Sequence, residues 1–288
     1  MLDRARGPAR QTHCNGAAAC NTSLLQVTSR RMSHVAPYSE PLRELAAEAY
    51  EISGRLCGAC GDLHALWPYI RLSRASTGVE AQESKLQAEL RGCFARGLRD
   101  VLIAGSQDAG LLALVAHAKM RAGAEHPSGI TVLDICETPL ELCRRLAGRW
   151  SLPIETIRED LAELSTARRF DLVLVHGTLH FMAADRRLEA LRGIASALRP
   201  GGRLVLLFNT SRTVTADSDQ TAGAGYGGSV LAELARLGVP LPATEAVMRE
   251  RLDLHQRVGG SCGKARSPSP ARSRRCWMPR GLTSSLAP

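Results

Sequence analysis

Residues 130–147 read ITVLDICETPLELCRRLA, and this stretch decides the fold class. Residues 130–133 are each β-branched or apolar, which predicts a short buried strand that ends at Asp134. After a turn at Pro139, apolar residues follow helical spacing, at Leu140, Cys143, Leu146 and Ala147. The order of strand, acid and helix is typical of an open α/β sheet, in which ligands bind beyond the carboxyl ends of the strands.

Asp134 has two interpretations at the end of this strand. Its carboxylate can accept hydrogen bonds from both ribose hydroxyls of a nucleotide-like cofactor, or it can cap the helix that follows. The preceding segment favours the first, because it places an apolar strand (101–104), a loop (105–110, GSQDAG) and an apolar helix (111–118) in order. A glycine at a strand end lets a ligand approach the backbone, and a helix N-terminus carries partial positive charge. The two segments together predict a βαβ unit with a nucleotide site.

Three more strands follow in the same alternation with helices. Residues 154–157 predict a third strand, and residues 170–175 (FDLVLV) a fourth, which is almost uniformly apolar as buried parallel strands are. A helix over 186–198 is stopped by 199–202 (RPGG), before a fifth strand over 203–208. The alternation predicts an α/β fold with a doubly wound, mostly parallel sheet.

The regions that flank the sheet define the expected domains. Helical periodicity over 37–56 and 80–97 predicts a helical lid, and two further helices are expected over 230–237 and 243–254. No sixth or seventh strand is expected. We interpret the Ser/Pro/Arg-rich end as a divergent or mistranslated tail that leaves the fifth strand as an exposed edge. The expected organisation is a disordered basic segment (1–34, with Met32 as an alternative start), a helical lid (35–97), an α/β domain (98–255) and a disordered basic tail (256–288).

The composition suits a soluble globular protein. Hydrophobic residues make up 44% and charged residues 23%, and no apolar run approaches the roughly 20 residues of a membrane-spanning helix. The net charge of +9 resides in the ends: residues 1–34 hold five Arg and one Asp, and residues 257–288 hold six Arg, one Lys and no acid. The slightly acidic middle argues against a specific nucleic-acid interface in the fold, although the tails could bind polyanions without sequence preference.

The cysteines predict a reducing compartment, the cytoplasm, because nine is an odd number and they are scattered along the chain. Cys57-Gly-Ala-Cys60 and His64 form a weak zinc signal, since a structural site needs four ligands and no second pair lies nearby. A redox CxxC would need the strand–helix context of a thioredoxin-like unit. We therefore expect small residues packed between helices and no metal. Trp67 and Tyr69 either cover a site or clamp the helices to the sheet.

Four segments within residues 98–210 resemble the class I S-adenosylmethionine-dependent methyltransferases. The most specific is 198–206 (LRPGGRLVL), which is similar to the family's turn into strand five. The others are 170–175 followed by LHF, 132–135 (VLDI) followed by PLELC, and 159–161 (EDL). The resemblance implies a Rossmann-like sheet with strand order 3-2-1-4-5 and S-adenosylmethionine as cofactor.

The resemblance also implies roles for individual residues. The methionine part of the cofactor would pass close to Gly105, with Ser106 and Gln107 beside it. Asp134 would bind the ribose hydroxyls and Ile135 would pack on the adenine. The remaining expected cofactor contacts are Asp160 at the adenine amino group with Leu161 beside it, and His176 and Gly177 on the far side of the cofactor.

The first motif departs from the family pattern. Ile103 stands where the family usually has an acid, and Gln107 and Ala109 replace the second and third glycines. A Gln side chain there could hydrogen-bond the methionine carboxylate or block it. His180, just past the fourth strand, is the candidate general base because its unperturbed pKa of about 6.5 lies near neutrality. The alternative is a histidine that only hydrogen-bonds at a helix start.

The expected function is methyl transfer from S-adenosylmethionine to an oxygen or nitrogen of a small molecule, with no membrane partner and no assigned oligomeric state. An NAD(P)-dependent oxidoreductase is an alternative, because the glycine loop (residues 105–110) and Asp134 also fit a nicotinamide cofactor. A non-catalytic binding module is another, favoured by Gln107 and Ala109 in the glycine loop.

Overall fold

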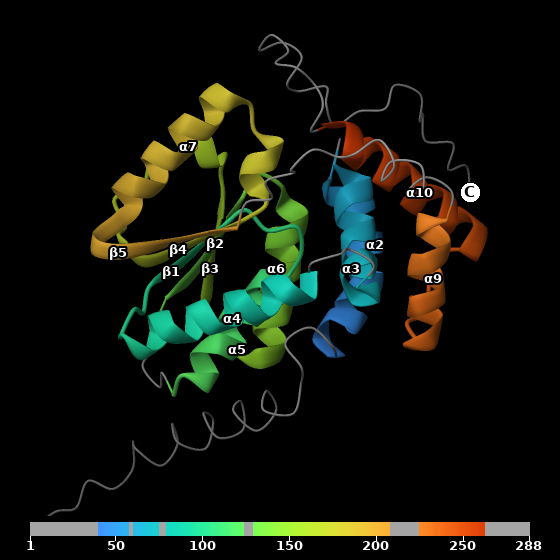
Figure 1. Ribbon diagram of the computed structural model, residues 1–288, viewed down its shortest axis with the longest axis horizontal. Helices are drawn as coiled ribbons and strands as arrows, with labels where there is room; N and C mark the ends of the chain where they lie inside the picture. Colours follow the sequence, from blue (N-terminus) through green and yellow to red (C-terminus); the bar gives the residue numbers. More distant parts are fainter. Residues whose placement is uncertain (1–39, 58–59, 75–78, 124–128, 208–224, 263–288) are drawn as a thin grey trace, which may run out of the picture. The chain divides into compact units, whose positions relative to one another are not determined.

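The computed structural model describes residues 40–57, 60–74, 79–123, 129–207 and 225–262 (Figure 1). The predictions for residues 1–34 and for most of the C-terminal tail lie outside these ranges. The helix α10 (Glu245–Cys262) continues past residue 256, where the tail was expected to begin. No helix in the described part of the chain has the length and apolar character needed to cross a membrane.

A five-stranded sheet forms the centre of the described chain (Figure 1). Its order is β3-β2-β1-β4-β5, and all neighbouring strands are parallel. The predicted order and class are therefore confirmed. The strands are β1 (Val101–Ala104), β2 (Ile130–Asp134), β3 (Ile154–Arg158), β4 (Phe170–His176) and β5 (Leu198–Leu207).

The fifth strand begins earlier than its sequence predicts. Residues 199–202 were expected to stop a helix ahead of the strand, but β5 already pairs at Leu198 with Phe170. The register then shifts between Phe170 and Leu172, and an irregularity of this kind lets a strand carry extra turn-forming residues. Among the described residues no further strand pairs with β5, so it forms one edge of the sheet.

Helices cover both faces of the sheet because the strand residues alternate in direction. Val101 and Ile103 pack into one core with helices α4 (Val79–Ala95), α5 (Gly110–Arg121) and α6 (Glu137–Trp150). Leu102 and Ala104 pack into the other core with α7 (Ala184–Ala197). Figure 1 shows α7 on one side of the strands and α4 and α5 on the other.

The N-terminal helices share the first of these cores. Helix α2 (Glu40–Leu56) packs on α3 (Gly61–Ser73) and on α6, while α3 also contacts α9 (Tyr226–Arg236) and α10. The helices expected over 80–97, 230–237 and 243–254 are thus confirmed, as is the described part, from residue 40, of the helix expected over 37–56. Tyr69 of α3 is fully buried and Trp67 packs against the same core, which favours the clamp interpretation of this aromatic segment.

Candidate functional site

The carboxyl ends of four neighbouring strands meet at one edge of the sheet. The backbone of Gly105, after β1, donates to Leu133 O of β2 at 2.7 Å. Glu159 N, after β3, donates to Asp134 O at 3.1 Å. The loop after β4 joins them through Thr178, whose hydroxyl donates to Ala104 O at 3.2 Å. The residues predicted from separate motifs therefore lie along a single edge.

Asp134 organises two of these loops. Its Oδ2 accepts the Ser106 N–H at 2.8 Å, and its Oδ1 accepts the Cys136 N–H at 2.7 Å. Burial raises the pKa of Asp134 to about 6, although the two backbone hydrogen bonds lower it. Cys136, not Asp134, is the N-cap of α6. Asp134 thus links the glycine loop to the start of α6 and is not a simple helix cap.

Ile135 is the most exposed large apolar side chain at this edge, at 64%. It follows the buried Asp134 directly, and Arg158 donates to its carbonyl at 3.4 Å. An exposed isoleucine next to a buried acid offers a hydrophobic surface for a flat ring beside a polar anchor. The adenine-packing role that the resemblance implies for Ile135 stays a prediction.

Gly105 is held in a left-handed conformation with φ of 84°. A Cβ on this residue would lie only 2.1 Å from Thr178 Oγ1, so the glycine is required by the loop after β4. The space directly over Gly105 is filled by Thr178. The sequence did not predict the contact between Gly105 and Thr178, because Thr178 lies on a different loop.

Asp160 and Leu161 lie just after β3. Asp160 Oδ1 accepts the Ala162 N–H at 2.9 Å and caps the short helix η1 (Leu161–Glu163). Its Oδ2 accepts a hydrogen bond from Arg186 Nη2 of α7 at 2.9 Å. Leu161 is buried in the core beneath α7. Both oxygens of the predicted adenine ligand therefore already have protein partners.

His176 ends β4, and Gly177 and His180 follow it. Burial and the nearby Arg71 guanidinium lower the pKa of His176 to about 4, so its imidazole is neutral at pH 7. His180 lies in η2 (Thr178–Phe181), with Nδ1 3.1 Å from Gly177 O. A carbonyl only accepts, so Nδ1 carries the proton in this hydrogen bond.

Comparisons with known proteins agree with this geometry. Residues 113–202 match the family model described as "Methyltransferase domain". This match and the strand order agree with the class I S-adenosylmethionine-dependent methyltransferase fold predicted from the sequence. The family and the cofactor predicted from the sequence are confirmed.

Individual relatives match only part of the chain. A 55-residue segment is 46% identical to carboxy-S-adenosyl-L-methionine synthase of Pseudomonas paraeruginosa, over 19% of this chain and 21% of that protein. The N-methyltransferase NodS of Bradyrhizobium japonicum is 25% identical, with 43% of this chain and 59% of that one covered and a TM-score of 0.36. The 1,6-didemethyltoxoflavin-N1-methyltransferase of Burkholderia thailandensis is 28% identical, with 59% and 63% covered and a TM-score of 0.35. The chain thus spans less than two thirds of each of these proteins, and TM-scores this low carry no inference about substrate.

The sequence did not predict a buried ion pair between α3 and the glycine loop (residues 105–110). Arg71 Nη2 of α3 lies 3.1 Å from Asp108 Oδ1, and both side chains are almost fully buried. Asp108 Oδ1 also accepts the Gly110 N–H at 2.8 Å. A Cβ at Gly110 would lie 2.6 Å from the Arg71 guanidinium, so this glycine leaves room for the arginine. A charged residue inside the loop was the only signal in the sequence.

The CxxC pair also has partners that its motif did not reveal. Cys136, beside Asp134, places its Sγ 3.2 Å from that of Cys57 and 3.4 Å from that of Cys60. His64 is buried next to them, with Nδ1 2.9 Å from Gln107 O. Burial lowers the pKa of His64, but its hydrogen bond to Cys136 contributes to a net rise. The motif expected to pack between helices thus adjoins the loops that follow β1 and β2.

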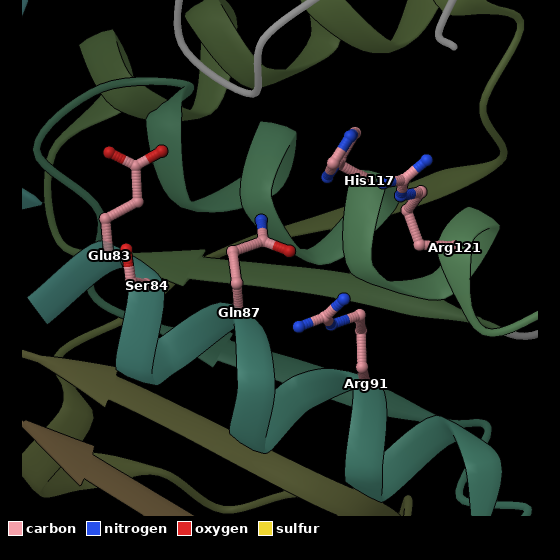
Figure 2. Close-up of a pocket in the computed structure, with 6 residues that line it drawn as sticks. All are labelled: Glu83, Ser84, Gln87, Arg91, His117 and Arg121. Atoms are coloured by element: carbon pink, nitrogen blue, oxygen red, sulfur yellow. The ribbon is translucent and has the colours of Figure 1, made fainter.

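Figure 2 shows a separate pocket between α4 and α5. Its cavity volume is about 290 Å³. None of the residues predicted for the cofactor lines it. Burial, together with Arg121 and Arg91, lowers the pKa of His117, so the pocket presents two arginines and a neutral histidine. The lining residues are Glu83, Ser84, Gln87, Arg91, His117 and Arg121.

Proposed function

We propose that this chain transfers the methyl group of S-adenosylmethionine to an oxygen or nitrogen of a small organic molecule. The observation that carries the proposal is the convergence of the loops after β1, β2, β3 and β4, with Asp134 tied to two of them. Ligands of open α/β sheets bind at such an edge. S-adenosylmethionine supplies an electrophilic methyl group on a sulfonium when it is bound there.

The residues of the edge are suited to a cationic, ribose-bearing ligand. Asp134 is the acceptor for the ribose hydroxyls in this proposal, and Ile135 offers its exposed side chain to the adenine. His176 is neutral at pH 7, so it adds no positive charge that would repel a sulfonium. Ser106 and Gln107 belong to the loop that would face the methionine part, while Asp160, Leu161 and Gly177 would complete the cradle.

His180 is the proposed proton acceptor. It follows the carboxyl end of β4 in η2, and its imidazole could take a proton from an acceptor hydroxyl or amine. Phe181, next in η2, is 43% exposed and provides an apolar surface for an organic acceptor. Proximity and alignment of the acceptor with the methyl group would supply most of the rate enhancement.

A second candidate is a binding module without turnover. Gln107 and Ala109 replace two family glycines, and Thr178 fills the space over Gly105. These side chains could narrow the path of the methionine part enough to admit S-adenosylhomocysteine without productive methyl transfer. Binding of S-adenosylhomocysteine with no product from a panel of phenol, amine and sugar acceptors would favour this candidate.

Thermal-shift titration with S-adenosylmethionine and S-adenosylhomocysteine tests the proposal, with NADH as the control ligand. At 100 times its dissociation constant, a ligand that binds only the folded state stabilises by about 2.7 kcal/mol. The Asp134→Ala variant should lose this shift, while Asp171→Ala, an acid at the opposite end of the sheet, should keep it. A stabilisation by NADH alone would overturn the proposal in favour of an oxidoreductase.

A further inference from the structure

We propose that Cys57, Cys60, His64 and Cys136 bind a structural zinc ion. One ligand atom from each of these residues lies within 4.8 Å of all the others. Zinc bound by sulfur at about 2.3 Å in a tetrahedron holds its sulfurs about 3.8 Å apart. The two short Sγ–Sγ distances, 3.2 and 3.4 Å, therefore need only a small expansion around the ion.

The histidine is already oriented as a metal ligand. Its Nδ1 lies 2.9 Å from the carbonyl oxygen of Gln107, and this contact requires the proton on Nδ1 because the carbonyl only accepts. Nε2 is then the ring nitrogen left to bind the metal once it is deprotonated. Metal-binding histidines commonly donate their other ring N–H to a backbone carbonyl in this way, which fixes the tautomer and the ring orientation.

The ligand set favours zinc over other common ions. Three thiolates and one imidazole are soft and borderline donors, which exclude magnesium and calcium, and four protein ligands leave no open position for a catalytic water. The spacing Cys57-x2-Cys60-x3-His64 places three ligands on one short segment at the start of α3. Binding would displace the thiol protons, so the affinity should rise with pH.

The ion would fasten α3 to both loops that the cofactor is proposed to contact. Cys136 N–H donates to Asp134 Oδ1, and His64 holds the carbonyl of Gln107 in the glycine loop. Thr138, in the first turn of α6, adds a contact of 2.6 Å between its Oγ1 and Cys57 Sγ. The role is structural, and the metal inference does not depend on methyltransferase activity.

Metal analysis of the full chain tests the proposal. The protein is expressed without a histidine tag, purified under reducing conditions and measured by inductively coupled plasma mass spectrometry. We expect one zinc per chain in the wild type, and loss of most of it in Cys60→Ser, Cys136→Ser and His64→Ala. Cys93→Ala is the matched control, because Cys93 is a buried cysteine of α4 outside the cluster. His64→Cys should retain the zinc, since a fourth thiolate completes a common structural ligand set.

Cobalt substitution provides a measurement that does not depend on how well the variants fold. Wild-type protein stripped of metal and titrated with Co²⁺ should show the visible bands of a tetrahedral ion and a near-ultraviolet thiolate charge-transfer band, saturating at one equivalent. A metal-free reduced protein with a featureless Co²⁺ titration would overturn the proposal. So would a disulfide among Cys57, Cys60 and Cys136 in protein that never carries metal, since that result assigns the cluster to redox chemistry.

Discussion

Two ion pairs join helices to loops at the carboxyl edge of the sheet, and they differ in burial far more than in distance. Arg71 of α3 lies 3.1 Å from Asp108 after β1, with both side chains no more than 6% exposed. Arg186 of α7 lies 2.9 Å from Asp160 after β3, with the side chains 34% and 30% exposed. Water can replace either partner of the second pair but not of the first. The buried pair therefore holds the glycine loop rigidly against α3, while the loop after β3 can adjust to a ligand.

Removal of one charge should expose this difference most strongly. Arg71→Met leaves the Asp108 carboxylate buried without its cation, which costs about 3–5 kcal/mol of the free energy of unfolding. Urea denaturation at pH 7 measures the change, provided that the slope with denaturant stays constant. Arg186→Met is the matched control. A loss below about 1 kcal/mol for Arg71→Met would mean that the pair is not buried in solution.

A second substitution should recover much of that loss. In the double variant Arg71→Met/Asp108→Asn, the buried charge is gone, while the Asn oxygen can still accept the Gly110 N–H that Asp108 now accepts at 2.8 Å. We expect the double variant to be about 2 kcal/mol more stable than Arg71→Met alone, because a lone buried charge costs more than a neutral polar group. Losses that simply add in the same urea titration would contradict this account.

The contrast between the two pairs also shows how far the sequence could lead. The strands were predictable because buried parallel strands are short apolar runs. The position of Asp134 at the end of a strand was predictable because it directly follows such a run. The ion pair of Arg71 was not predictable, because its partner Asp108 follows a different element and the residues around Arg71 in α3 indicate only helix packing. The place of Cys136 in the cysteine–histidine cluster was not predicted for the same reason. The other three cluster residues are close in sequence, whereas Cys136 is brought beside them only when α6 packs in the fold. The early start of β5 depended on a register shift that composition does not encode.

Asp171 lies between the two pairs in burial and should show an intermediate effect that depends on pH. Its Oδ2 accepts the N–H groups of Arg99 and Asp100 at 2.9 Å each, and its Oδ1 accepts from Arg199 at 2.7 Å. Burial alone would raise the pKa of Asp171, but these hydrogen bonds lower it below its ordinary value. The stabilisation is therefore present above about pH 4, the ordinary value for Asp, and is lost as the pH falls through the lower folded-state pKa.

The Asp171→Asn variant tests this dependence. At pH 7 it should lose about 1–2 kcal/mol, because hydrogen bonds to a charged acceptor are stronger than those to a neutral amide. The difference from the wild type should shrink as the pH falls below 4, in denaturant titrations repeated at each pH. A difference that is the same at pH 3 and pH 7 would assign the loss to packing and not to the charge.

The exposed pair should give the smallest effect. Arg186→Met is expected to lower the free energy of unfolding by no more than about 1 kcal/mol, because a partly exposed ion pair gains little over its hydrated separate charges. Arg186 also reaches Glu163 at 3.0 Å and Glu189 at 2.7 Å, so part of the cost will be repulsion among the three acids it leaves behind. That part should fall between 0.05 M and 1 M salt, since screening acts on exposed charges. A loss as large as that of Arg71→Met, or one insensitive to salt, would mean that Asp160 is anchored as firmly as Asp108 and that the loop after β3 is not the adjustable side of the site.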